Sequence, residues 1–121
     1  MTENQNPKQY DLEDRTYAFA LDVRGFVKRL KRTIANVEDG RQLIKASGSV
    51  GANYIEANEA LSRKDFLMRI RICRKEAKES RYWLRLVDTS EDQKLEDRRQ
   101  RLLQEATELT SIFGAIVRRS E

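Results

Sequence analysis

The chain has 121 residues, 36% of them charged, a formal net charge of +4 and a single proline, a balance typical of one small helical domain. It has no histidine and one cysteine, which excludes histidine-based catalysis, an internal disulfide and a Cys/His zinc site. No segment is apolar enough to span a membrane, and the start of the chain lacks the apolar run of a signal peptide. We therefore expect a cytoplasmic protein.

The chain divides into a short polar start and a helical remainder. Residues 1–9 (MTENQNPKQ) are expected to form a flexible leader, and residues 10–121 one folded domain. Apolar residues at alternating steps of three and four predict a first helix over about residues 11–32 and a second that ends near residue 61. Asn36 or Asp39 is expected to cap the second helix. Gly48 and Gly51 within it indicate either close approach by a neighbouring helix or a local bend.

The second half of the chain predicts two further helices. Ser62 is the expected N-cap of a helix up to about residue 87, with Asp65 at the capping-box position. Cys73 falls on the apolar stripe of this helix, so we expect a core residue and not a reactive thiol. Ser90 is the expected N-cap of the last helix. Since the connections are short, the sequence predicts an all-α, antiparallel up-down-up-down four-helix bundle.

Basic residues are concentrated in the third predicted helix, which has nine basic and four acidic residues between positions 62 and 88. At about 100° per residue, eight of the nine share a sector of about 120° that contains no carboxylate of the same helix. Such a row is typical of a surface that contacts nucleic-acid phosphates. The alternative is neutralisation by acids of the second or the fourth helix, and the fourth has Glu96, Asp97, Glu105 and Glu108. The eight residues are Arg63, Lys64, Arg71, Arg74, Lys75, Lys78, Arg81 and Arg85.

The same helix has a second group of apolar side chains away from its main stripe. A helix in a four-helix bundle needs only one buried face, so this group is a candidate oligomer interface. The alternative is that a wide core absorbs Trp83. The group comprises Met68, Ile72, Tyr82, Trp83 and Leu86.

Three segments resemble a known family: residues 49–57 (SVGANYIEA), 62–66 (SRKDF) and 79–86 (ESRYWLRL). Over about residues 10–118 the chain resembles the four-helix-bundle proteins encoded in intervening sequences of bacterial 23S rRNA genes. That family is similar to the accessory variability protein (Avd) of diversity-generating retroelements. The resemblance implies a homopentamer with a basic surface that faces nucleic acid and no catalytic site. The likeness to Avd also implies a reverse transcriptase as partner.

The resemblance also implies roles for individual residues. Tyr82, Trp83 and Leu86 are implied as packing or interface positions. The implied polyanion contacts are Arg63, Lys64, Arg81 and Arg85.

Two functions follow from the sequence. The first is a non-enzymatic, nucleic-acid-binding homo-oligomer without cofactor or metal, with the choice between RNA and DNA left open. The alternative is a protein-interaction scaffold or accessory subunit that binds a reverse transcriptase and has no direct nucleic-acid role. For an enzyme, the only carboxylates to inspect are Glu56 and Glu59, which are expected to form a solvated face or an intersubunit ion pair.

Overall fold

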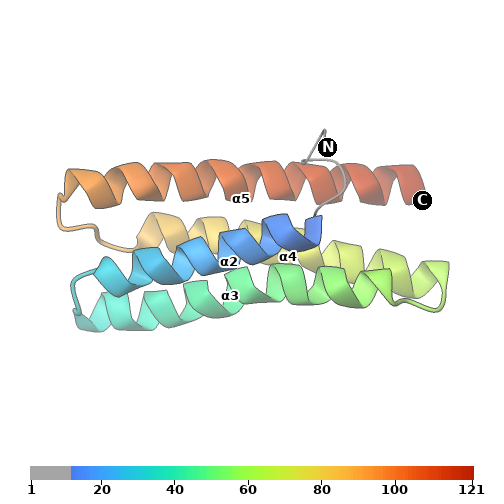
Figure 1. Cartoon of the computed structure of the whole chain (residues 1–121), viewed down its shortest axis with the longest axis horizontal. Helices are drawn as coiled ribbons and strands as arrows, with labels where there is room; N and C mark the ends of the chain where they lie inside the picture. The colour runs from blue at the N-terminus through green and yellow to red at the C-terminus, as the bar shows by residue number, and fades with distance from the viewer. Residues whose placement is uncertain (1–11) are drawn as a thin grey trace, which may run out of the picture.

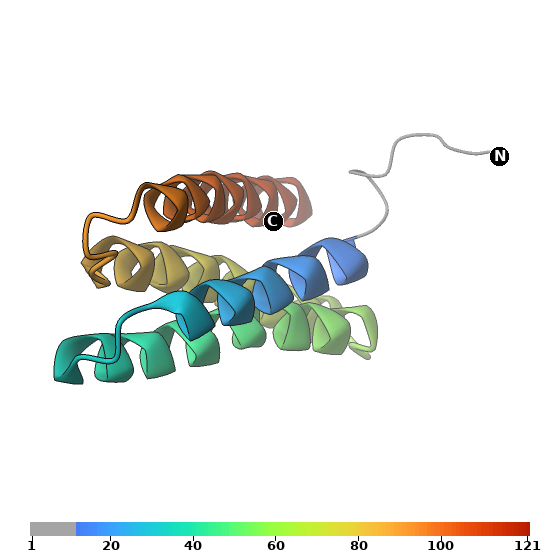
Figure 2. The same ribbon diagram turned by 60° about the vertical axis from the view of Figure 1, so that its left-hand side comes forward.

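The computed structural model describes residues 12–121. It contains α2 (Leu12–Arg29), α3 (Ile34–Asn58), α4 (Arg63–Leu86) and α5 (Gln93–Ser120), whose connections lie at alternate ends of the molecule (Figure 1). Figure 2 shows α5 beside α4 and α2 beside α3. Further contacts join α3 to α4 and α2 to α5, so the four helices surround one core. The predicted all-α four-helix bundle is confirmed, whereas the predicted leader, residues 1–9, lies outside the described part of the chain.

The core is built from the apolar stripes that predicted the helices. Its largest fully buried side chains come from all four helices: Phe19 and Phe26 of α2, Leu43 of α3, Ile70 and Leu84 of α4, and Phe113 of α5. Burial of a side chain of this size stabilises a fold by about 1.5–3 kcal/mol. None of the described helices is long and apolar enough to cross a membrane.

Cys73 is fully buried in this core, as predicted. Its thiol lies 3.4 Å from the Val50 carbonyl oxygen of α3 and donates to it. Burial raises the pKa of Cys73 to about 12. Because the thiolate is the reactive form, the pKa and the burial together describe an unreactive structural cysteine.

α3 is one continuous helix through Gly48 and Gly51, and of these two glycines Gly51 lies at a close contact with another helix. A Cβ built on Gly51 would lie 2.8 Å from the Thr16 Oγ1 atom and 3.2 Å from the Thr16 Cβ atom, both in α2. At Gly48 the nearest neighbour is the mobile end of the Arg24 side chain, at 3.4 Å. Close approach therefore explains Gly51, while Gly48 only borders a flexible guanidinium.

One of the three predicted helix caps is confirmed and two are wrong. The Ser62 side chain accepts a hydrogen bond from the Asp65 backbone N–H, as predicted. Thr33, and not Asn36 or Asp39, caps α3 by accepting from the Asn36 backbone N–H at 3.1 Å. Asn36 instead joins the two loops at this end of the bundle, because its side-chain amide bonds the backbone of Lys31 and, twice, that of Asp88.

The third cap prediction, Ser90 for the last helix, is wrong because the chain turns once more before the helix begins. Ser90 and Glu91 have backbone φ angles of 56° and 60°, in the left-handed region. Asp92 is the actual cap, and its carboxylate accepts from the Leu95 backbone N–H at 3.1 Å.

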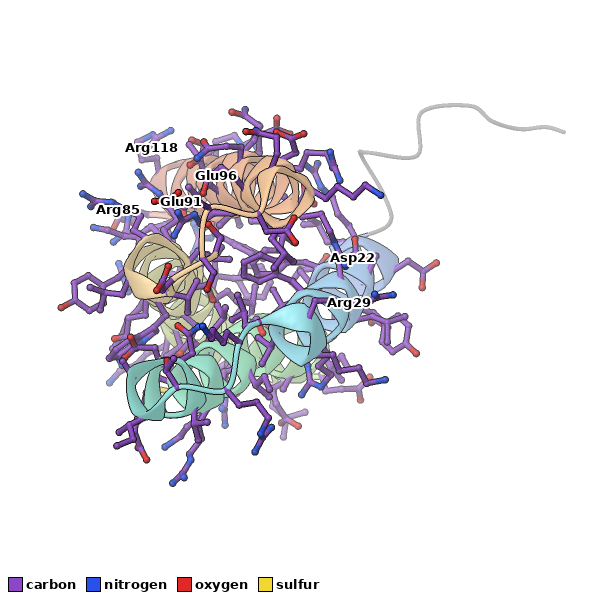
Figure 3. The ribbon with its side chains drawn as sticks, turned by 90° about the vertical axis from the view of Figure 1, so that its left-hand side faces the viewer. Asp22, Arg29, Arg85, Glu91, Glu96 and Arg118 are labelled. Carbon is purple, nitrogen blue, oxygen red and sulfur yellow. The ribbon has the colours of Figure 1, made fainter. Side chains whose placement is uncertain are left out.

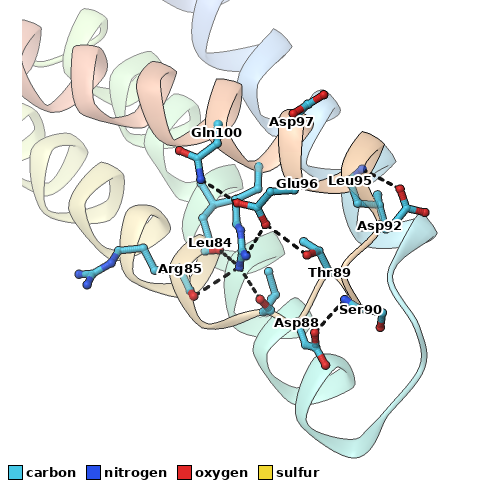
Figure 4. A network of polar contacts seen from close by, with 12 residues as sticks. Leu84, Arg85, Asp88, Thr89, Ser90, Asp92, Leu95, Glu96, Asp97 and Gln100 are labelled. Carbon is cyan, nitrogen blue, oxygen red and sulfur yellow. Dashed lines mark hydrogen bonds and ion pairs between the residues drawn. The ribbon is translucent and has the colours of Figure 1, made fainter.

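An arginine of α5 closes the C-terminal end of α4 (Figure 4). The Arg99 Nη1 atom donates to the carbonyl oxygens of Val87 at 2.5 Å and Leu84 at 3.3 Å. Its Nη2 atom pairs with the Glu96 carboxylate at 2.6 Å, which also accepts from Thr89. Carbonyls at a helix end have no partner within the helix, so Arg99 supplies the hydrogen bonds that α4 cannot make for itself.

Candidate nucleic-acid interface

The predicted basic residues lie along the side of α4 that borders α5 and solvent. We call these eight residues the basic face: Arg63, Lys64, Arg71, Arg74, Lys75, Lys78, Arg81 and Arg85. Arg74 and Arg81 are half-buried and the other six are exposed. At about 1.5 Å per residue the row from Lys64 to Arg85 is roughly 30 Å long.

The edge of α5 next to the basic face is electrically neutral along most of its length. Contacts fix which edge this is: Arg99 binds the end of α4, and a Cβ on Gly114 would lie 3.7 Å from the Arg74 Cδ atom. Helical periodicity places Thr107 and Thr110 on the edge between them. Both threonine hydroxyls donate to carbonyls of their own helix, at 2.8 and 2.7 Å.

Two acids of α5 that were candidates for neutralising the basic face turn toward α2. The Arg15 Nε atom lies 2.7 Å from the Glu105 carboxylate, and its Nη2 atom lies 2.7 Å from that of Glu108. The hydrogen bonds that Arg15 donates to the Glu105 carboxylate are the main reason why the pKa of Arg15 is raised. This charge-assisted cluster connects α2 to α5 on the side of α5 away from the basic face.

The basic face is nevertheless partly neutralised, which corrects the expectation that no acid of its own helix offsets it. The Lys75 ammonium lies 3.7 Å from the carboxylates of both Glu76 and Glu79. Arg71 pairs with Glu121 at 2.6 Å, beyond the end of α5. The sector was assigned from the angular positions of Cα atoms around the helix. A long lysine side chain can reach carboxylates outside its own sector.

Other basic residues of α4 have no carboxylate partner in the described part of the chain. Within residues 12–121, Lys64, Lys78 and Arg85 are exposed and have no carboxylate partner. Arg63 donates to the Ser120 carbonyl oxygen at 2.9 Å, so its charge is not neutralised. In the same part of the chain the Arg81 Nε atom is buried without a hydrogen-bond partner.

A hollow of about 290 Å³ lies in the middle of the basic face. Its lining contains four cations and one acid, so its net charge favours an anion such as a phosphate. The lining residues are Arg71, Arg74, Lys75, Lys78 and Glu79.

Sequence reasoning missed Arg118, which extends the basic face onto α5. Figure 3 shows Arg118 and Arg85 pointing outward on the same side of the bundle. A Cβ on Gly114 would lie 3.4 Å from the Arg118 Nη1 atom, so Arg118 and Arg74 both pass over this glycine. The sequence signal for this arrangement was Gly114, four residues before Arg118 in the last predicted helix, because a residue without a side chain leaves room for the arginine to cross it.

The predicted interface residues separate into exposed and half-buried members. Met68, Tyr82 and Leu86 are 45%, 55% and 48% exposed. Helical periodicity places them on one side of α4, and we call these three residues the outer apolar patch. Ile72 is half-buried. Trp83 packs against the core, and its ring centroid lies 5.0 Å from that of Tyr82 in a T-shaped arrangement, so Trp83 contacts both the core and the patch.

The two carboxylates considered for catalysis lie on the surface of the bundle. Glu56 and Glu59 are exposed near the end of α3. Among the described residues no group of three or more thiol or carboxylate ligands could hold a metal ion.

Fold and surface together define a small four-helix-bundle protein with a cationic side. A family model described as 23S rRNA-intervening sequence protein matches residues 8–115, and the chain belongs to this family, as its sequence motifs indicated. Among solved structures it is similar to a protein of unknown function from the S23 ribosomal protein family of Bacteroides thetaiotaomicron. The two are 28% identical with a TM-score of 0.74, over 87% of this chain and 96% of the other. A search among curated proteins found no match.

Proposed function

We propose that this protein is a non-enzymatic homo-oligomer that binds RNA or DNA by holding phosphates against the basic face of α4 and Arg118. The observation that supports it most is that Lys64, Lys78 and Arg85 of α4 are exposed without a carboxylate partner within residues 12–121, beside an edge of α5 on which Thr107 and Thr110 lie. Glu105 and Glu108 turn toward Arg15 on the other side of α5. Cations held together in this way repel one another, and a polyanion relieves that repulsion.

Phosphate contacts alone give binding that tolerates any sequence. Lys78 and Arg85 are exposed on the same helix, where their charges can contact the phosphate backbone of a nucleic acid. We therefore expect binding that does not depend on base sequence, so that any specificity comes from the shape of the nucleic acid.

A scaffold for a protein such as a reverse transcriptase is the second candidate. The ion pairs Arg71–Glu121 and Lys75–Glu79 favour it, because cations already paired within the chain attract phosphate less. The two functions differ in whether the exposed cations of α4 control nucleic-acid affinity.

Charge reversal tests that difference. The double variant Lys78→Glu, Arg85→Glu should weaken binding of single-stranded RNA and duplex DNA by similar factors for unrelated sequences, measured by fluorescence anisotropy. Arg119→Glu is the matched control, since Arg119 is exposed about 140° around α5 from Gly114. The single variants Lys78→Glu and Arg85→Glu, which each change the charge as much as Arg119→Glu does, should lose more affinity than it. Equal losses in these three single variants, or an unchanged affinity in the double variant, would overturn the proposal in favour of the scaffold.

The oligomer is proposed on the exposed apolar patch of α4, with the pentamer following from the family resemblance. Light scattering should give about five times the chain mass of 14.2 kDa. Leu86→Ala should lower this mass without loss of helical circular dichroism, because Leu86 is half exposed and not part of the core. A monodisperse wild-type monomer at micromolar concentration would refute this part of the proposal.

A further inference from the structure

A second surface of distinct chemistry lies where α2 turns into α3. A hollow of about 300 Å³ opens there between the end of α2 and the first turns of α3. Its walls are aliphatic, formed by Val27, Leu30, Val37, Gly40 and Ile44. Ile34 and Val37, in the first turn of α3, are 87% and 37% exposed.

The polar group in this hollow is already fully used. The Asn36 amide nitrogen donates to the carbonyls of Lys31 at 3.0 Å and Asp88 at 2.9 Å, and its oxygen accepts from the Asp88 N–H at 2.9 Å. An incoming group therefore meets an apolar floor. A polar group placed in this space would lose its hydrogen bonds to water without gaining new ones, whereas an apolar side chain would not.

Basic residues surround this apolar floor. Lys31, Arg32 and Arg41 line the hollow, and residues 24–45 contain seven basic and two acidic residues. Arg41 has only an exposed contact with Glu38 at 3.6 Å, while Lys31 and Arg32 have no carboxylate partner within residues 12–121. An exposed ion pair of this length contributes little, so the rim remains available to an acidic partner.

We propose that this corner of the bundle docks a segment of a partner protein in which a bulky aliphatic or aromatic side chain is flanked by Asp or Glu. The apolar side chain fills the hollow, and the flanking carboxylates meet Lys31, Arg32 and Arg41. A nucleic acid fits less well, because the described residues that line the hollow include no aromatic ring on which a base could stack, and the aliphatic walls would desolvate a phosphate. The site is separate from the basic face and does not depend on the function proposed for that face.

The corner is ordered before any partner arrives. The Thr33 cap and the backbone hydrogen bond from the Val37 N–H to the Thr33 carbonyl at 2.9 Å fix the first turn of α3, and Asn36 ties the connection to the neighbouring loop. A preformed site avoids the entropy cost of ordering a loop on binding.

The test is selection of a displayed library of random short peptides on the full chain, followed by titration of one labelled enriched peptide. Enriched sequences should place a bulky apolar residue next to Asp or Glu. Val37→Asp and Arg32→Glu should each weaken the labelled peptide by about tenfold or more, as expected when an anchor contact is lost. Both positions are exposed, and circular dichroism verifies that the variants fold.

Two controls make the outcome decisive. Lys78→Glu makes the same charge change on α4 and should leave peptide binding unaltered, whereas Arg32→Glu should leave RNA binding unaltered. Enriched peptides without acidic residues, or peptide binding insensitive to both corner variants, would overturn the proposal. A loss of RNA binding in Arg32→Glu would reassign the corner to nucleic acid, and a loss of self-association would reassign it to a second copy of the chain; either result overturns the proposal as well.

Discussion

A methyl group added at Gly51 is expected to destabilise the bundle, and the same group added at Gly48 to stabilise it. A Cβ on Gly51 would lie 2.8 Å from the Thr16 Oγ1 atom, and Thr16 is fully buried, so the helices must move apart or a side chain must leave its rotamer. At Gly48 the new Cβ meets only the end of the Arg24 guanidinium at 3.4 Å, which can swing into solvent.

The magnitudes follow from two opposing effects. Replacing glycine by alanine within a helix stabilises it by about 1 kcal/mol. Overpacking a filled core costs about 1–3 kcal/mol. Gly51→Ala should therefore lose about 1 kcal/mol, whereas Gly48→Ala, without the overpacking cost, should gain about 0.5–1 kcal/mol.

The assay is urea unfolding followed by circular dichroism, at one protein concentration because an oligomer unfolds in a concentration-dependent way. In a Thr16→Ala background, which removes the clashing hydroxyl, Gly51→Ala should cost less, a coupling that a double-mutant cycle measures. If Gly51→Ala is as stable as Gly48→Ala or more so, the close packing of α2 on α3 described above is refuted.

Three further changes test the core and the Arg99 network. Cys73 should resist a thiol reagent at pH 8 in the folded chain, because burial raises its pKa to about 12, and should react after unfolding; rapid labelling of folded protein would contradict this. Arg99→Ala should lower the free energy of unfolding in urea by about 1–3 kcal/mol, since the Val87 carbonyl loses a charged donor; a neutral result would mean that water replaces it. Glu96→Gln should destabilise the fold at pH 7, because hydrogen bonds from Arg99, and then from Gln100, lower the pKa of Glu96. The ionised carboxylate therefore stabilises the fold at pH values above the usual glutamate pKa of about 4.3. This difference should disappear as pH falls through the lowered folded-state pKa, and a difference that persists in acid would contradict the assignment.

Local sequence patterns were sufficient for features that depend on one helix or one contact. The spacing of apolar residues located all four helices, Ser62 was recognised as a cap, and Cys73 was placed in the core. Gly51 was open between two explanations, and only the position of Thr16 decides between them.

Features that depend on distant segments were not predictable from spacing. Thr33 and Asn36 are both good capping residues, and the choice depends on Asn36 being needed by Asp88, 52 residues further along the chain. Ser90 was chosen for its residue type, while its left-handed backbone places the cap two residues later.

The helical wheel groups the eight basic residues on one side of α4, but it does not predict which of their charges are neutralised. A helical wheel does not show that Lys75 turns back to Glu79 or that Glu121 reaches Arg71. It also does not show that Arg118 crosses Gly114 to join the row. Charge balance depends on side-chain reach across helices, which the order of residues along one helix does not contain.

The salt dependence of nucleic-acid binding tests the central claim most directly. If the basic face neutralises about four or five phosphates, a plot of log affinity for duplex DNA against log salt concentration should have a slope of about −4. The slope should be less steep for single strands. Replacing both Lys78 and Arg85 by alanine should reduce that slope by roughly 2, whereas Arg119→Ala should leave it unchanged. A shallow slope in the wild type, or the same slope in all three proteins, would contradict phosphate binding by the basic face of α4.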